Sequence, residues 1–141
     1  MTRPLRIFLD ANILFSAAKS DGPIRSLVAR LLDAGHECWV DGYVIDEARR
    51  NITAKAASRL PSLDALLSLL HVAMSSSVAT GAAIEGLPDK DQPVVAAAAA
   101  LSCEMLVTGD RTHFGRFYGR LVRNVRIHSP RSLYEHLFPK S

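Results

Sequence analysis

The fold is decided by the stretch Arg6-Ile7-Phe8-Leu9-Asp10-Ala11-Asn12-Ile13-Leu14. Its first half is apolar on both faces, which indicates a strand buried in the middle of a sheet. Asp10 ends this run, and the residues from Asn12 onward can begin a helix at once. In an open α/β sheet, an acid at the carboxyl end of a strand lies in the crevice where ligands bind. Asp is also a favoured helix cap, so a purely structural role for Asp10 is the alternative.

A second stretch near the other end of the chain, Met105-Leu106-Val107-Thr108-Gly109-Asp110, has the same form. It is again a short apolar run that breaks into a turn and finishes on an acid. Two such strands favour a ligand-binding role for their acids over a separate capping role for each. We therefore take Asp10 and Asp110 as candidate site residues.

Strand-like and helical patterns alternate along the rest of the chain. Strands separated by helices favour a parallel sheet with right-handed crossovers and helices on both faces. We therefore predict a three-layer α/β fold, with a central parallel sheet of about five strands, built as one domain over residues 1–141. The predicted strands are 7–10, 37–40, 72–79, 105–108 and 125–127, and the predicted helices are 12–18, 24–32, 43–59, 62–71, 92–102, 112–118 and 130–138.

The composition, with 48% hydrophobic residues in 141, fits a soluble globular protein. No apolar run approaches the ~20 residues that span a bilayer, and Asp10 interrupts the apolar stretch where a signal peptide would lie. Cys38 and Cys103 are isolated and lack the spacing of a zinc site, so they predict buried, reduced thiols. We therefore expect a cytoplasmic protein with no membrane partner.

The basic residues are concentrated at the carboxyl end of the chain. Residues 111–141 carry seven Lys or Arg and one acid, although the net charge of the whole chain is only +3. Arg residues interleaved with aromatic residues suit a groove for single-stranded nucleic acid. A solvated basic surface over a few core aromatics is the alternative interpretation. The candidate nucleic-acid contacts are Arg111, Arg116, Arg120 and Arg123.

Further acids lie between the two strands. In the helix predicted after the second strand, Glu47 lies nearer the apolar face than Asp46 does, so Glu47 is the better candidate for a site-facing acid. The turn Pro88-Asp89-Lys90-Asp91-Gln92-Pro93 carries two more acids before an Ala-rich helix. Asp91 can cap that helix, and capping leaves Asp89 unexplained.

Taken together, these motifs resemble those of the PIN domain family. The matching segments keep their order and spacing over nearly the whole chain. They are Phe8-Leu9-Asp10-Ala11-Asn12-Ile13-Leu14, Glu47, Asp89-Lys90-Asp91-Gln92-Pro93-Val94-Val95-Ala96-Ala97-Ala98, Leu106-Val107-Thr108-Gly109-Asp110 and Ser129-Pro130-Arg131-Ser132-Leu133. No single motif is specific, but the motifs in this order are a strong signal. The resemblance is strongest to bacterial PIN proteins of the VapC type, the toxins of toxin–antitoxin pairs.

The resemblance implies an acidic site that binds Mg²⁺ or Mn²⁺ and cleaves RNA. It also implies that the first and fourth strands are neighbours, which would bring Asp10 and Asp110 together. All-oxygen ligands are hard donors that suit these two ions. The expected partners are an RNA substrate, an antitoxin protein and a second copy of the chain. The acids of the site would be Asp10, Glu47, Asp91 and Asp110, supported by Asn12, Thr108 and, at the periphery, Asp89.

Other interpretations remain to be weighed against this one. A haloacid-dehalogenase-type phosphatase needs a second acid where this chain has Asn12, and a receiver domain needs paired acids on its first strand. A non-catalytic PIN-fold module that binds RNA or protein stays open. The leucine-rich segment 63–70 has apolar residues on more than one helical face, which predicts a contact surface for a second copy or an antitoxin. A helix wholly buried in its own core is the alternative.

Overall fold

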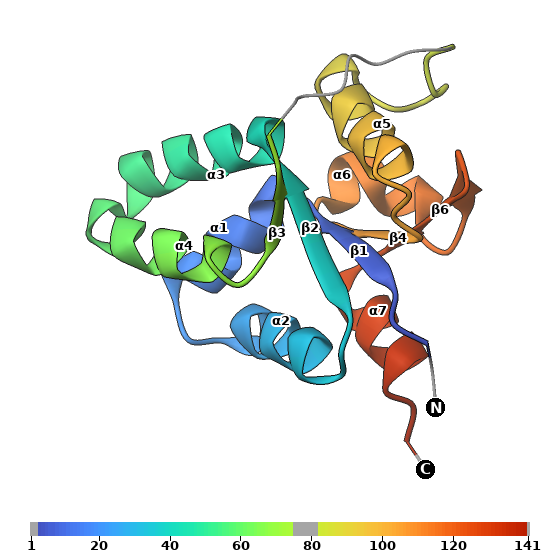
Figure 1. Ribbon diagram of the computed structural model, residues 1–141. Coiled ribbons are helices and arrows are strands. Elements are labelled where there is room, and N and C mark those ends of the chain that lie inside the picture. The colour runs from blue at the N-terminus through green and yellow to red at the C-terminus, as the bar shows by residue number, and fades with distance from the viewer. Residues whose placement is uncertain (1–2, 75–81, 141) are drawn as a thin grey trace.

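The computed structural model describes residues 3–74 and 82–140. Its centre is a sheet in the order β3-β2-β1-β4-β6-β5, with every pair parallel except the antiparallel pair β5 and β6 (Figure 1). The predicted α/β class and the parallel sheet of about five strands are therefore confirmed. The strands are β1 Arg6–Leu9, β2 Glu37–Asp41, β3 His71–Ala73, β4 Met105–Val107, β5 Leu121–Val122 and β6 Val125–His128.

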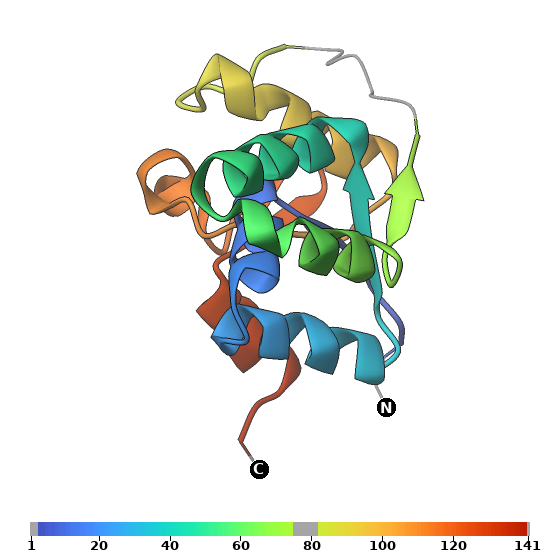
Figure 2. The ribbon, with the colours of Figure 1, turned by 90° about the vertical axis from the view of Figure 1, so that its left-hand side faces the viewer.

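Helices cover both faces of this sheet. The layer formed by α1 to α4 lies nearest the viewer in Figure 2, whereas α5 and α6 lie on the other side of the strands. The helix α7 packs against α2 and β6. The helices are α1 Ala11–Lys19, α2 Pro23–Asp33, α3 Gly42–Lys55, α4 Leu60–Leu67, α5 Gln92–Ala100, α6 Arg111–Phe114 and α7 Pro130–Leu137, with 3-10 turns η1 Ala57–Arg59, η2 Asp89–Asp91 and η3 Gly115–Phe117.

The two strands that carry the sequence motifs form the middle of the core. Ile7, Phe8 and Leu9 of β1 are 0% exposed, as are Leu106 and Val107 of β4. Because both faces of these strands are buried, their sequences are continuous apolar runs and do not alternate with polar residues. The Ala-rich helix α5 packs against β4 and the neighbouring β6. The buried apolar core thus fixes the direction in which both strands end.

The sheet has a topological switch point between β1 and β4. From β1 the chain builds β2 and β3 on one side, and it then crosses over to form β4 and β6 on the other. Leu9 pairs with Val107 in the register of β1 and β4. The residues that follow, Asp10 and Thr108, therefore emerge side by side at the carboxyl edge of the sheet, where such folds bind their ligands.

Several predicted boundaries differ from the structure. The helix predicted over 43–59 ends at Lys55, because Ala56 leaves the helical conformation with φ −158° and ψ 56°. Pro61, which lies between the predicted helices 43–59 and 62–71, is in the first turn of α4, where proline is tolerated. That helix ends at Leu67, not at residue 71. Of the strand predicted over 72–79, only Val72 and Ala73 are confirmed, because β3 ends at Ala73 and 75–79 lie outside the described residues.

The last predicted strand, 125–127, becomes β6 and has a further strand, β5, paired with its outer side. The turn between them consists of Arg123 and Asn124, both with positive φ (49° and 65°). Two residues with positive φ form the tight hairpin turn whose twist suits antiparallel strands. The turn sequence Arg123-Asn124 differs from the Asn-Gly pair that usually marks such a hairpin. The sequence analysis therefore did not predict it.

Within the described residues, no helix is both long enough and apolar enough to span a membrane. Cys38 and Cys103 are both free and buried, as predicted. Burial raises the pKa of each thiol to about 12. Both thiols therefore stay protonated and unreactive at neutral pH.

Candidate metal centre

Asp10 lies at the carboxyl end of β1 and is only 5% exposed. Its Oδ1 accepts a hydrogen bond from the backbone N–H of Ala11 at 2.8 Å, so it does cap α1. Its Oδ2 accepts from the hydroxyl of Thr108 at 2.8 Å and from Nδ2 of Asn12 at 3.3 Å. Capping therefore uses one carboxylate oxygen, and the other belongs to a polar network between β1 and β4.

Asn12 and Thr108 lock the two strand ends together. Oδ1 of Asn12 accepts from the backbone N–H of Gly109 at 2.8 Å, and its Nδ2 lies 3.2 Å from Oγ1 of Thr108. The same hydroxyl accepts from the backbone N–H of Asp110 at 3.2 Å. Both residues thus lie between the first and last candidate acids and bond to both segments.

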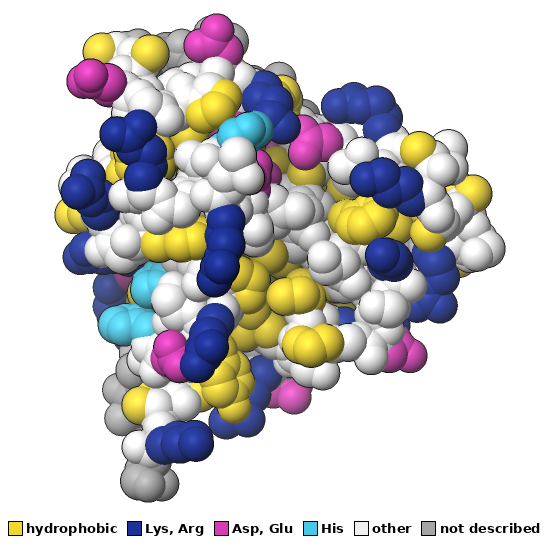
Figure 3. Space-filling view, turned by 180° about the vertical axis from the view of Figure 1, so that it is seen from behind, with side chains coloured by type: hydrophobic (Ala, Val, Ile, Leu, Met, Phe, Trp, Pro, Cys, Tyr) yellow, Lys and Arg dark blue, Asp and Glu magenta, His cyan; other side chains and the backbone are white. Residues whose placement is uncertain are grey.

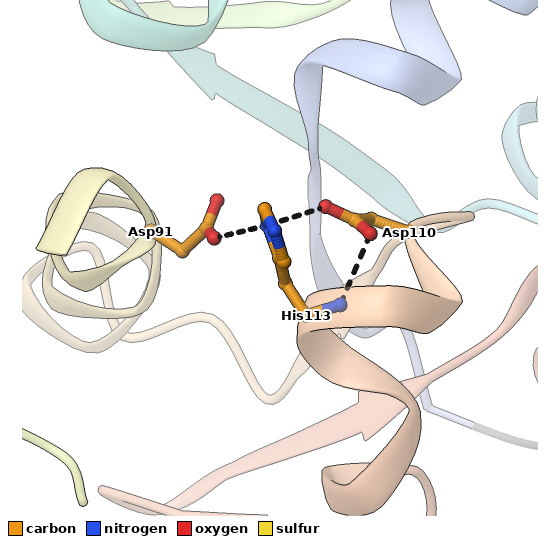
Figure 4. A group of neighbouring side chains, drawn as sticks. All are labelled: Asp91, Asp110 and His113. Carbon is orange, nitrogen blue, oxygen red and sulfur yellow. Dashed lines mark hydrogen bonds and ion pairs between the residues drawn. The ribbon is translucent and has the colours of Figure 1, made fainter. Parts of the chain in front are cut away.

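Asp110 follows this network at the start of α6. Its Oδ1 caps the helix by accepting from the backbone N–H of His113 at 3.1 Å. Its Oδ2 lies 2.9 Å from Nδ1 of the same histidine, and Oδ2 of Asp91 lies 2.8 Å from that nitrogen. Figure 4 shows the imidazole of His113 between the two carboxylates. The sequence analysis missed His113, although it follows Asp110 by one helical turn.

Asp91 occupies the N-cap position of α5, but its side chain does not cap that helix as predicted. Its backbone has φ −97° and ψ −12°, whereas a cap residue usually adopts an extended conformation, and its side chain makes no capping hydrogen bond. The 3-10 turn η2 sets this conformation and turns the carboxylate toward His113. Asp89, at the other end of the turn, is exposed, so its place is peripheral.

Glu47 approaches the cluster from α3. It lines a pocket of about 380 Å³ together with Asn12 and Asp110, whereas Asp46 is exposed. The hydroxyl of Tyr43, one turn earlier, donates to the backbone carbonyl of Lys90 at 2.6 Å. This bond ties the amino-terminal turn of α3 to η2, which carries Asp91. The helical-face argument thus selected the acid that faces the pocket.

The electrostatics of this cluster oppose its full ionisation. Burial raises the pKa of Asp10 to about 6 and outweighs the hydrogen bonds from Thr108 and Ala11, and the nearby carboxylates of Glu47 and Asp91 raise it further. Burial also raises the pKa of Asp91, whereas His113 lowers it. Carboxylates crowded in this way are stabilised by a cation. The donors fit a hard divalent ion because they are carboxylate oxygens, and Oδ2 of Asp91 is buried without a regular hydrogen bond.

The four candidate nucleic-acid contacts fall into two pairs. Arg111 and Arg120 are exposed. The other two contact the segment 82–88 before Asp91: the guanidinium of Arg116 packs against Gly86, and that of Arg123 donates to a carbonyl at the segment's start. On the face seen in Figure 3, a few acidic side chains and a histidine lie together, with Lys and Arg side chains around them.

Residues 6–112 match the PIN domain family. The chain belongs to this family. The match covers both strand motifs and each of the candidate acids. Among curated protein sequences, none matches the chain significantly.

Solved structures of VapBC complexes share the PIN fold of this chain. A chain of VapBC2 from Rickettsia felis, bound to a DNA fragment from its promoter, aligns with a TM-score of 0.64 and 18% identity over 89% of this chain and 98% of that one. A chain of DNA-bound VapBC from Salmonella typhimurium aligns with a TM-score of 0.60 and 16% identity, again over 89% of this chain and 98% of that one. A chain of VapBC-1 from nontypeable Haemophilus influenzae aligns with a TM-score of 0.59 and 11% identity, over 90% of this chain and 99% of that one. At these identities the likeness shows the fold.

Proposed function

We propose that this PIN domain is a metal-dependent endoribonuclease that cleaves single-stranded or structured RNA. The observation that carries the proposal is the convergence of Asp10, Glu47, Asp91 and Asp110, from four separate elements, around one carboxyl edge of the sheet. No cap or ion pair requires four acids at one place. A site for a divalent cation that binds a phosphodiester substrate accounts for such a cluster.

In this proposal Asp10, Asp91 and Asp110 hold Mg²⁺ or Mn²⁺, and Glu47 lies at the open side of the site. A bound ion supplies a more acidic water and neutralises the charge of the phosphoryl transition state. Asn12 and Thr108 fix the orientation of the Asp10 carboxylate through their hydrogen bonds. An acid that is left free of metal accepts the proton of the attacking water. The arginines around the site contact RNA phosphates.

RNA cleavage with and without Mg²⁺ or Mn²⁺ tests this function directly. The wild-type protein should cut a labelled RNA only with the metal present, and Asp110→Asn should abolish the cut. The alternative is a PIN-fold module that binds RNA or protein without cleaving. Such a module would retain RNA binding in the absence of metal and show no rise in melting temperature with either ion.

We further propose that the protein is a cytoplasmic toxin of a type II toxin–antitoxin pair and forms a homodimer. The solved VapBC complexes support an antitoxin partner. Leu69 after α4 is 63% exposed and borders an apolar pocket of about 300 Å³ with Val28, Leu32 and Leu66. An exposed apolar surface of this kind suits a partner helix.

Co-purification with the product of the adjacent small gene tests this partner, with Leu69→Asp as the disrupting variant. Ser68→Asp, at the neighbouring exposed position, is the matched control. A neighbouring product that does not bind the wild-type chain would refute the pairing. Sedimentation of the chain alone tests the homodimer, and a monomer at micromolar concentration would refute that part.

A further inference from the structure

The imidazole of His113 has a position that its role in α6 does not explain. Its backbone N–H satisfies the cap, which needs nothing from the ring. The ring nonetheless points between Asp91 and Asp110, which belong to different elements of the fold (Figure 4). One atom each of Asp91, Asp110 and His113 lie within 4.8 Å of one another.

Hydrogen bonding does not account for this arrangement. Nδ1 of His113 can carry at most one proton, yet it faces carboxylate oxygens at 2.8 Å and 2.9 Å. Neither Nδ1 nor Oδ2 of Asp91 makes a regular hydrogen bond, although both atoms are buried, and they form an ion pair with each other only when His113 is protonated. The Asp91 side chain is 9% exposed, so this oxygen faces into the cluster. A buried polar atom of this kind requires an explanation.

The distances suit neighbouring ligands of one cation. Donors at ~2.0–2.1 Å from the centre of an octahedron are separated along its edges by ~2.8–3.0 Å. The two separations measured from Nδ1 fall in that interval. Asp91, Asp110 and His113 would each offer one donor atom to a cation bound at this cluster.

We propose that His113 is a metal ligand of this site: its Nδ1 joins Oδ2 of Asp91 and Oδ2 of Asp110, and this nitrogen donor makes the site prefer Mn²⁺ to Mg²⁺. The inference rests on the proposed metal-dependent function and deepens it. Imidazole suits transition metals, whereas Mg²⁺ prefers oxygen donors alone. The acids predicted from the sequence would by themselves make an all-oxygen site without this preference.

Pulsed electron paramagnetic resonance of the full-length protein with one equivalent of Mn²⁺ tests the proposal. The wild-type spectrum should show coupling between the electron spin and one directly bound nitrogen, and ¹⁵N-labelled histidine should change that coupling. His113→Asn, which offers an oxygen where Nδ1 lies, should lose the coupling. It should also lower the ratio of Mn²⁺ to Mg²⁺ affinity about ten-fold or more. His71→Asn, an exposed histidine on β3, is the control.

The outcomes separate this inference from the nuclease function. Mn²⁺ bound in an Asp91-dependent manner without nitrogen coupling would overturn the role of His113 and leave the nuclease intact. Nitrogen coupling in a protein that cuts no RNA would support the ligand and refute the nuclease. A protein that binds no Mn²⁺ at all would overturn both. The wild-type spectrum decides these cases even where His113→Asn fails to fold.

Discussion

The hydroxyl of Thr108 donates a hydrogen bond to Oδ2 of Asp10 at 2.8 Å, although 98 positions separate the two residues. Parallel pairing of β1 with β4 brings them together, since Leu9 and Val107 are partners in register immediately before them. Packing of the apolar core therefore sets the orientation of the carboxylate. The same residues that fold the sheet also position the carboxylate at its edge.

Thr108→Val tests this connection, because valine keeps the shape of threonine and removes its hydroxyl. The change removes one of the two donors to Oδ2 of Asp10 and the hydroxyl that accepts from the N–H of Asp110. We expect a loss of about 1–3 kcal/mol in the free energy of unfolding, and a metal affinity lowered by about 10- to 100-fold. Thr108→Ser retains the hydroxyl and should stay near wild type in denaturant unfolding and calorimetric titration. Equal losses in both variants would mean that packing, and not the hydroxyl, matters here.

The pH dependence of stability tests the crowded carboxylates. The folded-state pKa of Asp10 is raised from 3.8 to about 6, so between these values the folded protein holds a proton that the unfolded chain has lost. Stability from Asp10 is therefore present at low pH and is lost as pH rises through this window. His128 acts in the opposite sense, because burial lowers its pKa to about 4. The contribution of Asp10 must therefore be measured as the difference in unfolding free energy between wild type and an Asp10 variant.

We expect the unfolding free energy of metal-free wild-type protein, minus that of Asp10→Asn, to fall as pH rises from about 4 to about 6. The total fall should be of the order of 3 kcal/mol for a shift of this size. Urea unfolding at a series of pH values, with a chelator present, measures it. A difference that stays flat across the window would show that the Asp10 carboxylate titrates normally.

The carboxyl-edge residues could be predicted because strand ends obey a simple rule. Asp10, Thr108 and Asp110 each follow a buried apolar run, and parallel strands end at one edge. The sequence predicted Asp91 as a site acid from its place before the Ala-rich helix. Its side chain does not cap that helix, because the 3-10 turn before α5 gives Asp91 a helical backbone. That turn depends on how 82–88 packs. The side chain of Gln92, for example, bonds the backbone of Ile84 and Leu87.

His113 shows where sequence reasoning had too little signal. It lies in a helix of four residues, which is too short for a periodic pattern to indicate a face. His113 becomes a candidate site residue only through its contact with the carboxylate of Asp91, which belongs to another element. The hairpin of β5 and β6 was missed for a related reason, since β5 has only two residues. Short elements are defined by their tertiary contacts.

Glu47→Gln separates a site acid from a surface acid on the same helix. Glu47 lines the pocket with Asn12 and Asp110, whereas the adjacent Asp46 is exposed. We expect Glu47→Gln to lower the cleavage rate by at least about 10²-fold, as for loss of a general base or a metal-positioning carboxylate. Asp46→Asn should cleave at the wild-type rate. An essential Asp46 beside a dispensable Glu47 would reverse the assignment of the site-facing side of α3.

The salt dependence of RNA binding distinguishes the two pairs of arginines. Arg111 and Arg120 are exposed, and each should lower the slope of log affinity against log salt by about one unit or less when replaced by Ala. Arg116 and Arg123 also contact the segment 82–88. Their replacement by Ala should therefore reduce stability as well as binding. An unchanged slope in Arg111→Ala with Arg120→Ala would locate both residues away from the RNA.

Asp10→Asn tests whether the acidic cluster serves function or stability. An acid kept for capping should cost about 1 kcal/mol when neutralised, but asparagine retains the oxygen that accepts from Ala11. The buried charge is costly, since the pKa of Asp10 is raised to about 6. We therefore expect metal-free Asp10→Asn at pH 7 to be at least as stable as wild type. It should lose RNA cleavage and most of the rise in melting temperature with Mg²⁺ or Mn²⁺.

Asp89→Asn, at the exposed end of the same acidic region, should change none of these. Cleavage and a full metal shift in Asp10→Asn would refute the site.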